Sequence, residues 1–180
     1  NKMKIVQEGG LEPLTLRTQS DDVEIQREVV AALCNLSLSD ENKFEIAKSG
    51  AVPPLIHRSQ SEDMEVARQA CGALANLAEM AENQVMIAAE GGIQPIISVL
   101  RSPYVEVQRE AGRALANLAA NTDNMTTIMD GGGHQLLISY LLSPDTACQR
   151  VGAMGIGNLA TNAKHRVSIV EAGALEPQQQ

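Results

Sequence analysis

Aromatic residues are scarce in this chain, which has one Phe, two Tyr and no Trp among its 180 residues. Stacked rings for nucleic-acid bases and aromatic cages for cations are therefore hard to build. Basic residues are also in the minority, because 14 Lys and Arg stand against 22 Asp and Glu, for a net charge of −8. Phosphate groups and anionic membranes both attract clustered Lys and Arg, so neither nucleic-acid binding nor direct membrane binding is expected.

Cysteine is equally scarce, and the three residues present, Cys34, Cys71 and Cys148, are far apart in the sequence. They cannot form a disulfide framework, and their spacing fits no zinc site. No apolar run approaches the roughly 20 residues of a membrane span. Without a signal peptide, this pattern predicts a cytoplasmic protein in a reducing compartment, with the cytosolic face of a membrane, the cytoskeleton or a cilium as alternatives.

An internal repeat of 41 residues runs through the chain without insertions. One column of this repeat is glycine: Gly9, Gly50, Gly91, Gly132 and Gly173. Columns of Leu, Asn and Arg keep the same step. A period of this length predicts a solenoid, in which each unit stacks on its neighbours.

The apolar pattern within one unit is helical. From Glu65 to Met80, apolar residues fall at i, i+4, i+7, i+8 and i+11, which indicates a long amphipathic helix. Pro95 suits the first turn of a shorter helix over 95–100. A short first helix over 83–90 ends at Gly91, where glycine can adopt the left-handed conformation. Each unit is therefore predicted to contain a short, a medium and a long helix.

Residues 83–119, NQVMIAAEGGIQPIISVLRSPYVEVQREAGRALANLA, resemble an armadillo repeat from the G-G-I/L-x-P opening to the A-L-x-N-L close. The resemblance covers almost the whole chain and implies an all-α, right-handed α-solenoid (superhelix) of about four three-helix units. The units are expected at about 1–41, 42–82, 83–123 and 124–164, with a partial unit at 165–180. Neither end resembles a polar cap, so we expect a fragment of a longer solenoid. The short loops resemble armadillo-only scaffolds, such as the vacuolar, apicomplexan and ciliary armadillo proteins.

The resemblance implies that an Asn near the end of each long helix faces a concave groove, as in importin-α and β-catenin. The matching positions are Asn35, Asn76, Asn117 and Asn158. A side-chain amide carries one donor group and one acceptor, and can pair with the main chain of an extended peptide. The alternative is that each Asn caps or braces the neighbouring helix through its amide.

Helix geometry identifies the neighbours of this Asn ladder, because a step of seven residues returns to almost the same direction. Seven residues before each Asn stand Glu28, Gln69, Glu110 and Val151. Four residues before each Asn stand Ala31, Gly72, Arg113 and Met154. In importin-α the second of these columns carries the Trp residues that hold cargo Lys and Arg, so the lack of Trp argues against such cargo. The mixed, small side chains favour close approach of a partner backbone or helix.

An Arg column, Arg27, Arg68, Arg109 and Arg150, lies about 80° from the line of the Asn ladder. Its members either form weak surface ion pairs or make a rim that orients acidic groups of a partner. We include Arg68 and Arg109 among the candidate binding residues. Arg17 and Arg58 stand where Val99 and Tyr140 stand in later units, and either snorkel or make a polar contact.

Residues that could carry catalysis or bind a metal are not grouped. His57, His134 and His165 occupy different unit positions, and the glycine run 131–133 has neither a preceding strand nor a following G-K-[ST]. Acidic pairs such as Glu62-Asp63 precede long helices, where they suit helix caps. The sequence thus predicts a non-enzymatic scaffold or adaptor, without cofactor or metal, that holds an extended peptide or partner helix in the groove. The alternative is a spacer in a large cytoskeletal or axonemal assembly, contacted on its convex face or ends.

Overall fold

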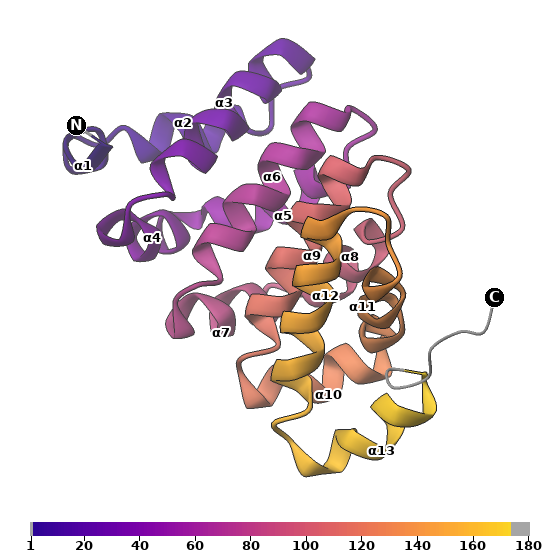
Figure 1. Ribbon diagram of the computed structural model, residues 1–180. Coiled ribbons are helices and arrows are strands. Elements are labelled where there is room, and N and C mark those ends of the chain that lie inside the picture. Colours follow the sequence, from indigo (N-terminus) through magenta and orange to yellow (C-terminus); the bar gives the residue numbers. More distant parts are fainter. Residues whose placement is uncertain (1, 174–180) are drawn as a thin grey trace.

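The computed structural model describes residues 2–173, which form helices and contain no strand (Figure 1). The short first helices are α1 Lys2–Gln7, α4 Asp40–Ile46, α7 Ala81–Ala89, α10 Thr122–Asp130 and α13 Ala163–Glu171. The second helices are α2 Leu11–Arg17, α5 Val52–Ser59, α8 Ile93–Val99 and α11 Gly133–Leu141. The long third helices are α3 Val23–Leu36, α6 Met64–Leu77, α9 Val105–Leu118 and α12 Thr146–Leu159.

These helices repeat in the predicted order and make an all-α solenoid of three-helix units. We call α1–α3, α4–α6, α7–α9 and α10–α12 units 1 to 4, and α13 follows as the first helix of the partial unit. The short helices of units 2 to 4 begin two residues before the boundaries expected from the sequence, at Asp40, Ala81 and Thr122. The predicted continuation of the partial unit, from 174 to 180, lies outside the described residues.

Glycine turns the chain between the first and second helices. The five glycines of the repeat all have positive φ, from 72° at Gly91 to 95° at Gly173. An L-residue with a side chain is strained in this left-handed region, so glycine is the natural choice there. In unit 2, Gly50 (φ 86°) lies in a short π-helical segment, η1 Ala47–Ala51, that joins α4 to α5. The predicted role of the glycine column as a helix terminator is confirmed.

The long helices pack side by side in one layer, α3 on α6, α6 on α9 and α9 on α12 (Figure 1). Each also packs on the second helix of its own unit, as α6 does on α5. Small residues such as Ala70 and Ala111 are fully buried on the faces of these helices, and they allow close helix approach. Leu74 and Leu115, on the same long helices, are also fully buried. The core is therefore continuous from unit to unit.

Aspartates cap three of the four long helices. Asp22 accepts a hydrogen bond from the backbone N–H of Glu24 (2.9 Å), and Asp145 accepts one from Cys148 (2.8 Å). Asp63 plays the same part at the start of α6, whereas Tyr104 precedes α9 without a side-chain cap. The expectation that acidic residues before the long helices act as caps is confirmed.

A second Asn column, in the first helices, ties consecutive units together. Asn83 is fully buried, and its Nδ2 donates to the carbonyls of Leu77 (3.0 Å) and Lys43 (3.1 Å). Both carbonyls belong to the preceding unit, Leu77 in α6 and Lys43 in α4. Asn42, at the same position in unit 2, donates only to Leu36, within the described residues.

We expect N83A to lower the free energy of unfolding by about 2 kcal/mol, because it removes two buried side-chain hydrogen bonds to the carbonyls of Leu77 and Lys43. The matched variant N42A removes one such bond and should cost less. Urea unfolding followed by circular dichroism measures both losses. Equal costs for the two variants would show that the additional bond from Asn83 to the Lys43 carbonyl contributes nothing to stability.

Candidate partner-binding site

The Asn ladder lies near the C-terminal ends of the long helices, and three of its members use their amide nitrogen within the solenoid. Nδ2 of Asn117 donates to the Ala75 carbonyl, and Nδ2 of Asn158 donates to the Ala116 carbonyl, both at 2.9 Å. Nδ2 of Asn76 points to the equivalent Cys34 carbonyl (3.4 Å) and to Ser37 Oγ (3.0 Å). Each amide therefore braces the long helix of the preceding unit.

The remaining oxygen of each amide distinguishes the members of the ladder. Oδ1 of Asn76 accepts a hydrogen bond from Arg113, and Asn76 is only 2% exposed. Asn117 and Asn158 are half-buried, and within residues 2–173 their Oδ1 atoms accept no hydrogen bond. Asn35, in unit 1, is exposed. The acceptors that remain open to a ligand are therefore those of Asn117 and Asn158, together with the whole amide of Asn35.

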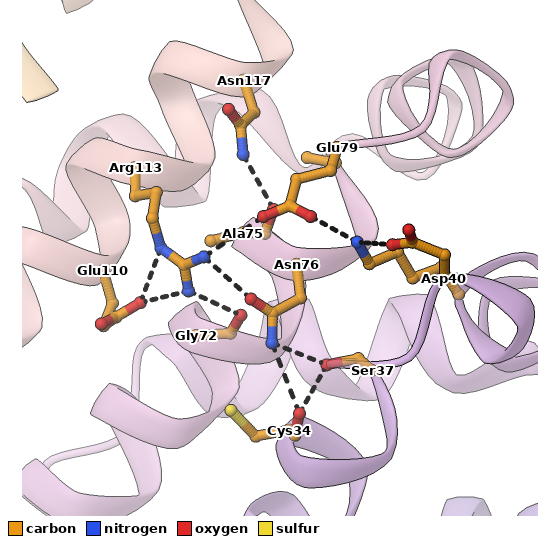
Figure 2. A network of polar contacts seen from close by, with 12 residues as sticks. Cys34, Ser37, Asp40, Gly72, Ala75, Asn76, Glu79, Glu110, Arg113 and Asn117 are labelled. Carbon is orange, nitrogen blue, oxygen red and sulfur yellow. Dashed lines mark hydrogen bonds and ion pairs between the residues drawn. The ribbon is translucent and has the colours of Figure 1, made fainter. Parts of the chain in front are cut away.

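Arg113 is the centre of a polar network on this face (Figure 2). Its guanidinium donates to Glu110 Oε2 (2.7 Å) in its own helix and to Asn76 Oδ1 (2.8 Å) on α6. It also reaches the Gly72 carbonyl (3.4 Å) and Glu79 Oε1 (3.5 Å). A Cβ added at Gly72 would lie 3.1 Å from Cys34 Sγ and 3.5 Å from Glu110 Oε2, so glycine leaves room there for the carboxylate that holds Arg113.

The network continues from Glu79 toward Asp40 (Figure 2), and Lys43 of α4 connects these two carboxylates. Nζ of Lys43 pairs with Asp40 (2.6 Å) and with the second oxygen of Glu79, and the Lys43 side chain is only 5% exposed. Burial lowers the pKa of Lys43, but the hydrogen bonds to Asp40 and Glu79 outweigh it, so its pKa stands above the ordinary value. Positive and negative side chains therefore alternate from Arg113 in unit 3 through Glu79 to Lys43 and Asp40 in unit 2.

Sequence reasoning missed Lys43 and Glu79, although both are part of this network. Glu79 departs from its column, which carries Leu38, Ala120 and Thr161 in the other units, whereas Lys43 shares its position with Lys2. The departure of Glu79 was the available signal, but an isolated Glu is normally a surface residue.

The other candidate residues fall into two groups. Gln69 Nε2 donates to Glu65 Oε1 (2.8 Å), and Arg68 pairs with the same carboxylate (2.6 Å), so these two lie together on α6. Their hydrogen bonds, that of Arg68 first, lower the pKa of Glu65. Glu28 is exposed on α3, and within the described part of the chain it makes no hydrogen bond or ion pair. Glu110 joins the Arg113 network instead.

Two of the four residues in the Arg column connect neighbouring units. Arg27 forms a two-pronged pair with Asp63 (2.6 and 3.2 Å), and Arg109 does so with Asp145. In each case the acceptor is the cap of the next long helix. Arg68 lacks this partner because Tyr104 occupies the equivalent position. The guanidinium of Arg109 is therefore held by this chain, and its predicted contact with a partner would compete with Asp145.

The reactive side chains found in the structure do not form a catalytic group. Cys71 and Cys148 are buried, Cys34 is half-buried, and burial raises the pKa of each thiol, to about 12 for Cys71. Burial is the main cause that lowers the pKa of His134.

Residues 2–173 contain no group of three metal-binding side chains. Nor does this range include a helix of the length and apolarity that a bilayer crossing requires.

The stacked three-helix units define the chain as an α-solenoid protein with an open face on its long helices. A model of the armadillo/β-catenin-like repeat matches residues 1–38, 39–79 and 80–120. The chain therefore belongs to the armadillo repeat family. No curated protein sequence matches it.

Several solved structures are similar. One engineered protein is 36% identical over 96% of this chain, which spans 43% of that protein, with a TM-score of 0.92. Another engineered protein is 33% identical, with 92% of this chain and 69% of the other aligned and a TM-score of 0.87. A designed armadillo repeat protein, solved in complex with the peptide (KR)4, is 26% identical over 97% of this chain and 74% of its own, with a TM-score of 0.92.

The Arg109 pair gives a pH-dependent prediction. The hydrogen bond from Arg109, followed by that from the Cys148 backbone, holds the pKa of Asp145 well below its ordinary 3.8. The stability from this depressed pKa is present above the unfolded value and is lost as pH falls through the folded one. We expect R109Q to melt at a lower temperature than the parent at neutral pH and to lose less between about pH 5 and about pH 2.

Thermal melting across this pH range measures the difference. R150Q is the matched control, since Arg150 occupies the same column and makes no ion pair within residues 2–173. Parallel pH profiles for R109Q and the parent would show that the Asp145 pair contributes nothing to acid sensitivity.

Proposed function

We propose that the protein is a non-enzymatic scaffold that binds an extended segment of a partner protein along the face of its long helices. The observation that supports this most directly is the pair of open Oδ1 acceptors on Asn117 and Asn158. They lie at equivalent positions on α9 and α12, and their Nδ2 atoms are fixed on the preceding helix. Two such acceptors can take main-chain N–H groups of one peptide in register.

Because Nδ2 is already bonded, the proposed contact differs from the two-pronged one expected from the sequence. The ladder offers acceptors without donors at these two units, so the peptide must contribute N–H groups. At unit 2 the Arg113 network covers Asn76, and a partner meets Arg113, Glu110 and Glu79 there instead. The designed armadillo protein that carries the peptide (KR)4 supports a peptide as ligand of this family's surface.

The three free thiols fit a reducing compartment, and we place the protein in the cytoplasm on that ground. The competing spacer function uses the convex face or the ends of the solenoid. Removal of the Asn acceptors on the long helices should therefore abolish peptide binding but leave a spacer function unchanged.

The test begins with selection of binding peptides from a randomised display library, followed by affinity measurements on purified variants. We expect N117A and N158A each to weaken a selected peptide about tenfold, because each removes one hydrogen bond to the ligand. The double variant should lose nearly all binding. Circular dichroism checks that the variants keep their helices, since each also loses a bond to the preceding unit.

The matched control is Q108A/Q149A. These glutamines also donate a side-chain amide to a backbone carbonyl, but from the opposite ends of α9 and α12. Gln108 donates to the Ser102 carbonyl (2.6 Å) and Gln149 to the Ser143 carbonyl (2.8 Å). The control should keep full affinity at a similar cost in stability. Peptides that bind the N117A/N158A variant as tightly as the parent would overturn the proposal and favour the spacer function.

A further inference from the structure

A crevice runs between neighbouring units at the other edge of the solenoid, where each second helix turns into its long helix. Between units 2 and 3 it forms a cavity of about 510 Å³. Its lining includes Ser61, Glu62, Met64, Val99 and Tyr104. The same edge between units 1 and 2 holds a cavity of about 560 Å³, lined in part by Arg58.

The first of these junctions shows how the protein supplies its own hydrogen-bond donors to the loop carbonyls beside such a crevice. Nε of Arg58 donates to the Thr18 carbonyl (2.7 Å), and its Nη2 points to the Ser20 carbonyl (3.3 Å). Ser20 also accepts from Gln26 Nε2 (2.7 Å). Of the two interpretations left open for Arg58, the polar contact is therefore the one observed. Arg17 is exposed.

The junction between units 3 and 4 uses other side chains for the same purpose. Tyr140, at the position of Arg58, donates its hydroxyl to the Leu100 carbonyl (2.9 Å), the equivalent of Thr18. Gln108 donates to the Ser102 carbonyl (2.6 Å), the equivalent of Ser20. Both loop carbonyls thus have side-chain donors at this junction too.

The middle junction lacks every one of these donors. Val99 stands in place of Arg58 and Tyr140, and Ala67 stands in place of Gln26 and Gln108. Within residues 2–173, the carbonyls of Ser59 and Ser61 accept no side-chain hydrogen bond, although Ser59 is only 1% exposed. Tyr104 also replaces the aspartate cap, and its side chain is left 46% exposed at the crevice. Three departures from the repeat therefore coincide at one cavity.

We propose that this crevice binds an arginine side chain presented by a partner protein. A backbone carbonyl can only accept a hydrogen bond, so the ligand must be a donor. The guanidinium donates to Ser61 in the way that Arg58 donates to Ser20, and Glu62 supplies a negative charge in the lining. Met64 and Val99 contact the aliphatic stem, and the Tyr104 ring offers a face to the cation.

Arg101 also lines the cavity, and its charge opposes a cationic ligand. It is exposed, so solvent screens this repulsion. Removal of the charge should strengthen binding, which gives the proposal a test in the favourable direction.

This site is separate from the proposed peptide contact of the Asn ladder. Met64 begins α6 and Asn76 is near its end, which puts about 18 Å of helix between the two surfaces. A negative result at one site therefore does not count against the proposal for the other site.

The experiment is a titration of ¹⁵N-labelled protein with N-acetyl-arginine methylamide, followed by amide chemical shifts. We expect saturable shifts, with a dissociation constant in the millimolar range, centred on Ser61, Glu62 and Tyr104. The citrulline analogue has the same shape without the charge and should bind about tenfold more weakly. The lysine analogue should also bind more weakly, because it lacks the planar set of donors.

Variants that copy the filled junctions supply the controls. A67Q places an amide where Gln26 lies, V99R places a guanidinium where Arg58 lies, and either should reduce binding at least about tenfold. The reciprocal variant Q26A/R58V opens the first junction and should create a second arginine site near Ser20. R101Q should bind the probe more tightly than the parent.

Three results would overturn the proposal: no saturable shift at Ser61 in the folded parent, equal affinity for the citrulline analogue, or unchanged affinity in folded A67Q. If A67Q does not fold, unchanged affinity in folded V99R, or no new arginine site near Ser20 in folded Q26A/R58V, overturns the proposal instead. N117A/N158A should leave the arginine titration unchanged.

Discussion

Close packing of the long helices is the constraint on which the other features depend. Alanine and glycine on the facing sides of α6 and α9 let the backbones approach, and the Asn of one helix then reaches the carbonyl of the helix before it. A bulky residue in place of Ala70 or Ala111 would move the helices apart and break this brace. The second Asn column adds polar contacts at every junction between units, and the Arg–Asp pairs add a third set at the first and last junctions.

These polar contacts explain why the repeat has so regular a period. An amide or guanidinium that must meet a group about 40 residues away tolerates no insertion between the two. Apolar contacts alone would accept small shifts, because they have no direction. A hydrogen bond to a buried carbonyl does not accept such a shift, because a buried carbonyl that loses its donor lowers the stability of the fold. Asn83 of unit 3 shows this most clearly, because its single Nδ2 donates to two carbonyls of unit 2, those of Leu77 and Lys43.

The fold could be predicted from sequence because periodicity reports what every unit shares. The long helix over 64–77 follows from its apolar spacing, and the turn at Gly50 follows from the glycine column. The candidate site was only partly predictable, because it depends on residues in which units differ. Arg113 covers Asn76, whereas Met154 stands in the same column one unit later. No pattern within a single helix shows that a side chain one unit away occupies an amide oxygen.

Departures from the repeat therefore carry most of the information about function. A residue that follows its column serves the stack, as Asn117 Nδ2 does, and is already bonded within the chain. A residue that departs from its column either adds a contact, as Glu79 does, or removes one, as Val99 and Ala67 do at the middle junction. Removal leaves backbone carbonyls facing an open crevice, and a surface with unmet acceptors selects for ligands that bring donors. The open Oδ1 atoms of the Asn ladder follow the same rule at the far end of the helices. Both surfaces of this acidic solenoid thus offer acceptors, which favours partner segments that supply N–H groups from their main chain at one edge and from arginine at the other.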